Sequence, residues 1–178
     1  MNASVKNIML DLETLSTMPN AMICSIGAVV FDQSGLGAEF YRRIKIDSCD
    51  QAGAHISPST VMWWLRQSSE ARDGFDTEKS SEFIPTLMDF SAFMQHYAPD
   101  ANLWGNGADF DNVILASAYH RTGLVIPWGN YKSRCYRTLK SIAPKIKIDR
   151  SGIHHHALDD ARSQAEHAIA LLNHVGGW

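Results

Sequence analysis

Three segments of the sequence place acidic residues next to a run of apolar residues in a way that could support chemistry. The first is Asp11-Leu12-Glu13-Thr14, which ends an apolar segment with the period of two that a strand requires. Two carboxylates on one face of a strand repel each other and lose hydration unless a cation or solvent compensates them. Hard divalent ions meet that need. The other interpretation is a sheet edge with solvated acids, and a D-x-E pattern alone does not separate the two.

The second acidic segment is Asn106-Gly107-Ala108-Asp109-Phe110-Asp111-Asn112, where a short strand ends and a helix begins. One of Asp109 and Asp111 is expected to cap this helix, since aspartate is a favoured N-cap residue. The other can point across the strand ends toward Asp11. The spacing does not choose between them.

The third segment, His154-His155-His156-Ala157-Leu158-Asp159-Asp160, leads into the final helix. It can be a polar cap, because acids are favoured near a helix amino end. A zinc site made of all three histidines is disfavoured, since consecutive side chains diverge and no further Cys or His has the expected spacing. A histidine base with one carboxylate fits the segment better.

The surrounding pattern predicts the elements that position these groups. Residues 5–13 alternate, so that Asp11 and Glu13 share a face opposite Leu12. Further strands are expected at 23–31, 40–46, 101–105 and 133–136. Helices are expected at 57–65, from 79 or 84 to 97, and at 110–118, 139–143 and 161–172. This order predicts a single α/β domain with a mixed sheet over residues 1–178.

The composition is that of an ordinary soluble domain: 178 residues, 45% hydrophobic and 20% charged. The net charge of −3 disfavours sequence-independent coating of duplexes, although bound divalent ions can supply positive charge at a local site. Cys24, Cys49 and Cys135 form no paired pattern, which favours a reducing, cytoplasmic setting. Neither a signal peptide nor an apolar run of ~20 residues is evident, so no membrane association is expected.

Together the three segments resemble the DnaQ-like, or DEDDh, family of 3′–5′ exonucleases. Asp11 and Glu13 match the first motif, Asp111 the second, and His155-x-Ala157-x-x-Asp160 the third. Trp63-Trp64 and Arg137-Thr138-Leu139 make the chain most similar to the group of RNase AS and phage exonuclease A. Oligoribonuclease and RNase T, more distant relatives, are homodimers, so the resemblance raises a homodimer as a possibility.

The resemblance implies an RNase H-like fold, a mixed sheet of about five strands flanked by helices. It also implies hydrolysis from the 3′ end of single-stranded RNA or DNA, releasing nucleoside 5′-monophosphates with two Mg²⁺ or Mn²⁺ ions. Asp11, Glu13 and Asp160 then surround the metal that holds the attacking water. Asp11 bridges to the second metal, and Asp111 supports that ion. His155 is the general base, a role that suits an imidazole near neutral pH.

Contacts to substrate are expected next to these carboxylates. The resemblance implies that Leu12 and Thr14 touch the terminal nucleotide, with a core position as the alternative for Leu12. Trp64 and Trp104, like Trp63, can either stack on a base or fill the core. A register error of one residue would exchange His155 and Asp160 with their neighbours His154, His156 and Asp159.

The same residues bear on other function classes. A haloacid-dehalogenase-like phosphatase requires an aspartate where Glu13 stands and a lysine motif, which is not evident. A catalytically silent RNase H-like nucleic-acid-binding or adaptor domain remains the alternative, although the complete motifs argue against it. An RNase H-like endonuclease is disfavoured by the histidine five residues before Asp160. Selection of RNA over DNA needs contacts to the 2′-hydroxyl that periodicity cannot locate.

Overall fold

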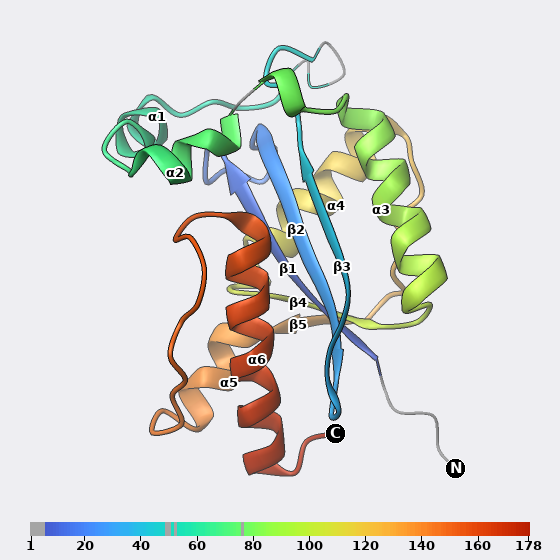
Figure 1. The fold of residues 1–178 in the computed structure, drawn as a ribbon. Helices are drawn as coiled ribbons and strands as arrows, with labels where there is room; N and C mark the ends of the chain where they lie inside the picture. Colours follow the sequence, from blue (N-terminus) through green and yellow to red (C-terminus); the bar gives the residue numbers. More distant parts are fainter. Residues whose placement is uncertain (1–5, 49–50, 52, 76) are drawn as a thin grey trace.

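The strand alternation seen in the sequence builds the centre of the molecule. The computed structural model describes residues 6–48, 51, 53–75 and 77–178; the segment 1–5 and Cys49 lie outside them. Within the described residues, one five-stranded sheet has the order β3-β2-β1-β4-β5 (Figure 1). Its strands are β1 (Asn7–Thr14), β2 (Ile23–Asp32), β3 (Gly35–Arg43), β4 (Asn102–Gly105) and β5 (Ser133–Cys135). β1, β2 and β3 pair antiparallel, whereas β4 is parallel to both β1 and β5. The expected mixed α/β architecture is confirmed.

Helices cover both faces of this sheet. They are α1 (Pro58–Trp64), α2 (Ser69–Arg72), α3 (Phe83–Tyr97), α4 (Asp111–Thr122), α5 (Tyr136–Ile142) and α6 (Ala157–Val175), with 3₁₀ turns η2 (Asp73–Phe75) and η3 (Thr77–Lys79). α3 and α4 lie on one face, and α5 and α6 on the other (Figure 1). Among the helices of the described residues, none is both long enough and apolar enough to cross a membrane.

Successive residues of β1 enter different cores, as the period of two requires. Ile8 and Leu10 pack with α3 and α4, whereas Met9 packs with α5 and α6. Trp104 of β4 belongs to the second core, is 7% exposed, and donates its indole N–H to Asn7 Oδ1 at 2.9 Å. Trp104 is therefore a core residue whose indole N–H has a hydrogen-bond partner.

Several boundaries differ from the sequence expectation because apolar periodicity marks the buried face of an element and not its first turn. α3 begins at Phe83, so Pro85 falls in the first turn, where its missing N–H costs no helical hydrogen bond. α6 begins at Ala157, four residues earlier than expected, and β3 begins at Gly35. α2, η2 and η3 were not expected, because such short elements carry no periodic signal.

A close approach between α6 and β2 places the third acidic segment over the first. A Cβ added to Gly27 would lie 2.2 Å from the carbonyl carbon of Ala157, so only glycine admits the first turn of α6 at this point. Gly27 is also the cross-strand partner of Asp11. The amino end of α6 is thereby fixed beside the carboxylates of β1.

Candidate active site

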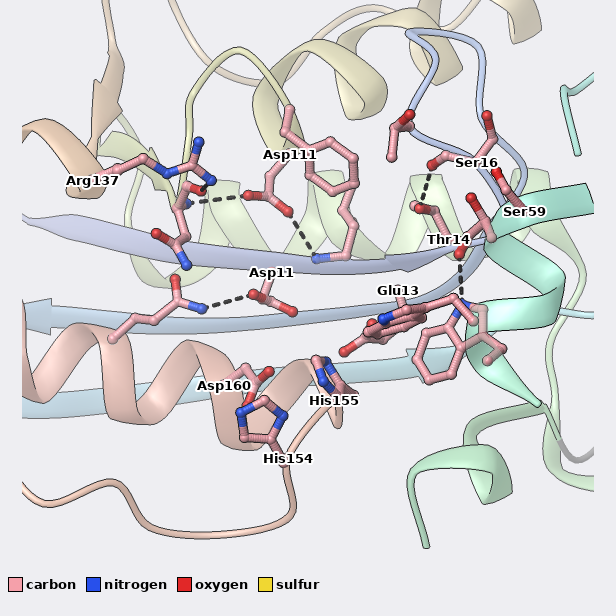
Figure 2. A pocket seen from close by; sticks show the side chains of 18 of the residues that line it. Asp11, Glu13, Thr14, Ser16, Ser59, Asp111, Arg137, His154, His155 and Asp160 are labelled. Carbon is pink, nitrogen blue, oxygen red and sulfur yellow. Dashed lines mark hydrogen bonds between the residues drawn. The ribbon is translucent and has the colours of Figure 1, made fainter. Parts of the chain in front are cut away.

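Four carboxylates and two histidines converge in a cleft where β1, α4 and α6 meet (Figure 2). The cleft has a volume of about 660 Å³. Its walls include Asp11, Glu13, Asp111, His155 and Asp160, which come from three distant parts of the sequence. One potential ligand atom each from Glu13, His155 and Asp160 lies within 4.8 Å of the other two. The structure thus brings together all five residues that the motifs singled out.

Asp11 and Glu13 lie on the same face of β1, as the alternation predicts. Asp11 Oδ1 accepts a hydrogen bond from Gln164 Nε2 at 2.7 Å. Gln164 was not predicted from the sequence. Its position one helical turn after Asp160 puts both side chains on the same face of α6, a signal that could have identified it.

Asp111 connects the start of α4 to β1. Its Oδ1 accepts from the Leu12 N–H at 3.1 Å and its Oδ2 from the Asn106 N–H at 3.2 Å. Asp111 is therefore the aspartate that points across the strand ends. The expectation that an aspartate caps α4 is wrong, because Phe110 occupies the cap position and no side chain caps the helix there.

The loop before α6 fixes the register of the third segment. His155 faces the cleft together with Asp160, and its ring packs edge-on against Trp63 with centroids 4.8 Å apart. His156 instead caps α6, with Nδ1 accepting from the Asp159 N–H at 3.4 Å. His154 lines the cleft beside His155. Of the alternative pair His156 and Asp159, neither lines the cleft.

Burial makes the cluster electrostatically costly. Loss of hydration and the neighbouring Asp111 raise the pKa of Glu13 to about 8. Burial also raises the pKa of Asp111 to about 7, despite hydrogen bonds from Leu12 and Asn106 that act in the opposite direction. Burial, then repulsion from Asp111 and Glu13, holds the pKa of Asp11 well above its ordinary value. Such a cluster binds either protons or cations.

Arg150 supplies positive charge from within the chain. Its guanidinium forms an ion pair with Asp160 and lies at the cleft. Its charge lowers the pKa of Asp11 and Glu13, but in both cases burial outweighs it. Neither Arg150 nor Arg137, which donates Nη2 to the Asn106 carbonyl at 2.7 Å, was predicted to contact the cluster.

The donor set fits divalent metal ions. Glu13 Oε1 is buried and has no hydrogen-bond partner among the described residues. An oxygen atom in that condition favours a cation, and carboxylate oxygens are the donors that Mg²⁺ and Mn²⁺ prefer. The raised pKa values of Glu13 and Asp111 indicate the same unmet need for positive charge.

His155 has the electrostatics of a base at neutral pH. Burial, followed by the charges of His154 and Arg150, lowers its pKa below the ordinary value. The ring is therefore neutral at pH 7 and can accept a proton.

The predicted substrate contacts lie in different environments. Leu12 lines the cleft but is 4% exposed and packs in the first core. Thr14 donates Oγ1 to the Ser16 carbonyl at 2.7 Å, and its own carbonyl accepts from Trp64 Nε1 at 2.9 Å. Trp64 is buried at the cleft wall, whereas Trp63 is 41% exposed there. The structure places Trp104 away from the cleft, in the core described above.

The sequence matches the model of one protein family, described as the 3′-5′ exoribonuclease Rv2179c-like domain, over residues 6–172. A comparison with curated proteins finds no significant match.

Solved structures of exonucleases resemble the chain in fold. The nuclease domain of 3'hExo, a DEDDh family member bound to rAMP, is 16% identical with a TM-score of 0.67, covering 99% of this chain and 96% of that one. E. coli exonuclease I in complex with a 5cy-dT13 oligonucleotide is 16% identical with a TM-score of 0.65, covering 97% of this chain and 41% of that one. Exonuclease I from Methylocaldum szegediense is 14% identical with a TM-score of 0.65, covering 96% and 40%. The chain thus spans about two fifths of these exonuclease I chains. The likeness confirms the expected RNase H-like fold.

Proposed function

Since the chain belongs to the family of Rv2179c-like 3′–5′ exoribonuclease domains and is a 3′–5′ exonuclease, we propose that it trims single-stranded nucleic acid by metal-assisted hydrolysis. The products are nucleoside 5′-monophosphates, and residues 1–178 form one such domain. The observation that carries the proposal is the meeting of Glu13, His155 and Asp160 within 4.8 Å, beside Asp11 and Asp111.

Asp11, Glu13, Asp111 and Asp160 would hold the metal, as two Mg²⁺ or Mn²⁺ ions. When bound, these ions supply Lewis acidity that stabilises negative charge on the phosphate and promotes ionisation of water. The raised pKa values of Glu13 and Asp111 support this assignment, because a cation compensates the lost hydration that raises both values and the repulsion from Asp111 that adds to the shift at Glu13.

His155 acts as the general base and accepts a proton from the attacking water on its ring. Its lowered pKa supports this role, since the neutral form dominates at pH 7. Leu12, Thr14 and Trp64, which line the cleft, would orient the terminal nucleotide. Trp63 supplies the most exposed aromatic face among the tryptophans of the cleft.

We propose RNA as the preferred polymer, on the description of the matching family as exoribonuclease domains. DNA is the alternative, and a catalytically silent nucleic-acid-binding domain is the second candidate function. Cys24 and Cys135 carry free thiols, which supports a reducing, cytoplasmic setting. A homodimer is proposed from the resemblance to oligoribonuclease and RNase T, and sedimentation velocity tests it.

The decisive experiment uses 5′-labelled single-stranded RNA and DNA of equal sequence, incubated with Mg²⁺ or Mn²⁺. The expected result is a ladder of stepwise shortened strands with release of 5′-monophosphates, faster on RNA and abolished by EDTA. Asp11→Asn is the matched inactive control, since it removes one carboxylate charge at nearly constant volume. Internal cuts would indicate an endonuclease. Intact strands would favour a catalytically silent nucleic-acid-binding domain.

A further inference from the structure

The loop that presents His155 has an unusual backbone. Gly152 has φ +81° and His155 itself has φ +63°, both in the left-handed region. A residue other than glycine, such as His155, rarely adopts this backbone conformation unless surrounding contacts enforce it. Contacts from other residues must therefore hold the loop in this conformation.

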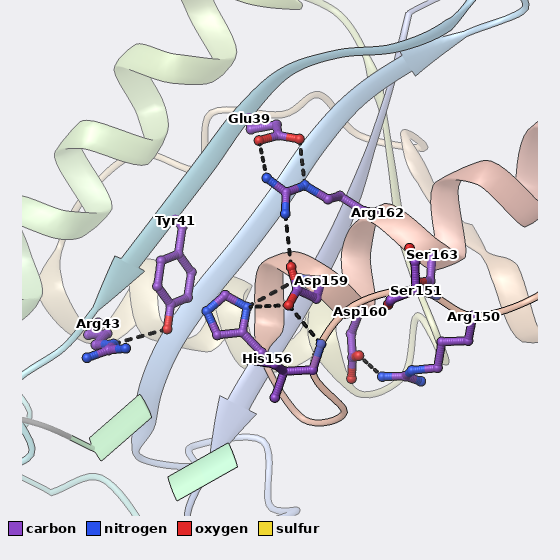
Figure 3. Close-up of polar contacts among 11 residues, drawn as sticks. Glu39, Tyr41, Arg43, Arg150, Ser151, His156, Asp159, Asp160, Arg162 and Ser163 are labelled. Atoms are coloured by element: carbon purple, nitrogen blue, oxygen red, sulfur yellow. Dashed lines mark hydrogen bonds and ion pairs between the residues drawn. The ribbon is translucent and has the colours of Figure 1, made fainter. Parts of the chain in front are cut away.

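Asp159 holds the backbone of this loop close to His155. Its Oδ2 accepts a hydrogen bond from the Ile153 N–H at 2.9 Å, two residues before His155 (Figure 3). A Cβ added to Gly152 would lie 2.6 Å from the Cβ and Cγ of Asp159, so the loop packs directly on this side chain. His156, the residue after His155, accepts a hydrogen bond from the Asp159 N–H, and its ring packs against Tyr41 at a tilt of 39° with centroids 4.4 Å apart.

Asp159 is itself fixed to the central sheet. Its Oδ1 accepts from Arg162 Nη1 at 2.9 Å. Arg162 donates Nε and Nη2 to the two oxygens of Glu39 on β3, at 2.7 and 2.6 Å. Figure 3 shows this path from β3 through Arg162 and Asp159 to the loop. Oδ1 of Asp159 is therefore held by Arg162 and Oδ2 by the Ile153 N–H, with His156 Nδ1 at 3.5 Å from Oδ2 as well.

Asp159 does not reach the reaction centre. The cleft is lined by its neighbour Asp160 and by His155, but not by Asp159. The side chain of Asp159 is only 16% exposed, so its contacts are shielded from water. An effect of Asp159 on the chemistry must therefore pass through the groups that it holds, which are the loop before α6 and the first turn of α6.

We propose that Asp159 is a positioning residue that sets His155 opposite Glu13 and Asp160, and that the Arg162–Glu39 pair holds Asp159 in the required orientation. The inference rests on the proposed role of His155. Misplacement of a reacting group by about 1 Å can cost on the order of 100-fold in rate, so a loosened loop is expected to lower kcat while leaving substrate affinity unchanged.

The test uses the two oxygens of Asp159. In Asp159→Asn only one oxygen remains, and the charged Arg162 attracts it more strongly than the Ile153 N–H does. The amide N–H₂ then faces the Ile153 N–H, and the loop loses its anchor. We expect kcat on the labelled RNA to fall about tenfold. KM and the calorimetric Kd for Mn²⁺ are expected to stay within about twofold of the original values.

A double variant separates positioning from a general loss of stability. Arg162→Met keeps much of the aliphatic stem but removes the competing donor. Arg162→Met alone keeps the bond from the Ile153 N–H and loses only the second contact of Asp159, so its kcat is expected to fall less than that of Asp159→Asn. In Asp159→Asn/Arg162→Met the asparagine oxygen is free to accept from Ile153, so kcat is expected to rise above that of Asp159→Asn to near that of Arg162→Met alone. Asp89→Asn is the matched control, because it breaks a different surface pair, with Arg42 of β3, away from the loop.

Amide hydrogen exchange supplies a readout that needs no catalysis. Exchange in residues 151–156 is expected to accelerate in Asp159→Asn and to slow again in the double variant, with the rest of the protein unchanged. Unchanged kcat and unchanged exchange in Asp159→Asn would overturn the inference, as would a loss that the double variant does not reverse. If the unaltered protein proves inactive, the proposed function fails, while hydrogen exchange still decides whether Asp159 holds the loop.

Discussion

Arg150 pairs with Asp160, so a guanidinium from the chain itself sits against one of the four carboxylates of the cleft. Arg150 belongs to the loop that leads to His155, and its charge also reaches Asp11 and Glu13. A divalent ion that binds Asp160 meets this positive charge at the same carboxylate. We therefore expect Arg150 and a metal ion to compete for Asp160.

Replacing Arg150 with glutamine is expected to strengthen metal binding. Loss of a partly exposed ion pair of roughly 1 kcal/mol corresponds to about fivefold in Kd. Titration calorimetry with Mn²⁺, in the absence of nucleic acid, measures the change. Arg42→Gln, which removes an arginine from a surface pair with Asp89, is the control and should leave Kd unaltered. Weaker Mn²⁺ binding in the Arg150 variant would contradict the competition.

The stability of the metal-free protein is expected to fall as pH rises from about 6.5 to 8.5. The pKa of Glu13 is about 8 and that of Asp111 about 7 in the folded state, against ordinary values of 4.5 and 3.8. Above pH 6.5 the unfolded chain has already lost both protons, whereas the folded chain still holds them. Because the folded state binds more protons, the free energy of unfolding decreases as pH passes through 7 and 8.

Denaturant unfolding in EDTA at several pH values checks this slope. The lowered pKa values of His154, His155 and His156 act in the opposite direction at lower pH, which is why the series begins at 6.5. Glu13→Gln is expected to flatten the curve. Stabilisation by Mn²⁺ should increase with pH, since the ligands must lose their protons to bind it. A free energy of unfolding that rises across this range would refute the prediction.

The side-chain placements that agree between sequence and structure are those with a local, periodic signal. Asp11 and Glu13 share a face because strands alternate, and the choice of Asp160 over Asp159 follows from a motif with fixed spacing on a helix. Asp109 and Asp111 could not be separated, since the turn between β4 and α4 has no period. Trp104 shows a further limit of sequence prediction. An aromatic residue in a strand gives the same sequence pattern whether its side chain faces substrate or the core.

Contacts between segments that are distant in the chain could not be predicted from the sequence. The pair Arg150–Asp160 and the hydrogen bond from Gln164 to Asp11 depend on where α6 crosses the sheet. That crossing is set by Gly27, whose role as a point of close approach leaves no trace in hydrophobic periodicity.

Gly27→Ala is expected to disrupt both stability and activity. The added Cβ would meet the backbone of Ala157 at 2.2 Å, so α6 must move away from β2. Overpacking of this kind costs about 1–3 kcal/mol, and the shift carries His155 and Asp160 away from Asp11. Gly37→Ala on β3 is the matched control, because its nearest contact would be an ordinary 3.5 Å. Thermal unfolding and RNA hydrolysis should change in the first variant and not in the second.

His155→Ala is expected to lower turnover by about 100-fold or more, in the range typical for loss of a general base. Mn²⁺ affinity should persist, because the four carboxylates remain. In the unaltered protein kcat should also decline on acidification, because the ring becomes protonated and because the carboxylates take up protons in place of the metal. At saturating Mn²⁺ the part of the decline that the ring causes should be absent in the variant. Single-turnover rates between pH 5 and 8 measure both effects. Full activity of the variant at neutral pH would remove His155 from the mechanism.

Trp63→Ala is expected to weaken nucleic-acid binding without unfolding the protein. The ring is 41% exposed, lines the cleft and packs edge-on against His155, so a stacked base would add contact to a surface that is already open. Base stacking on an aromatic side chain contributes about 1–3 kcal/mol, equivalent to roughly 5- to 150-fold in Kd. The measurement is fluorescence anisotropy with labelled single-stranded RNA in the Asp11→Asn background, where the strand stays intact.

Trp104→Phe serves as the control for the Trp63 variant. It alters a core residue, so the melting temperature should fall while the Kd for RNA stays constant. Equal Kd values with and without the Trp63 ring would exclude stacking there and leave the buried Trp64 as the remaining aromatic wall of the cleft.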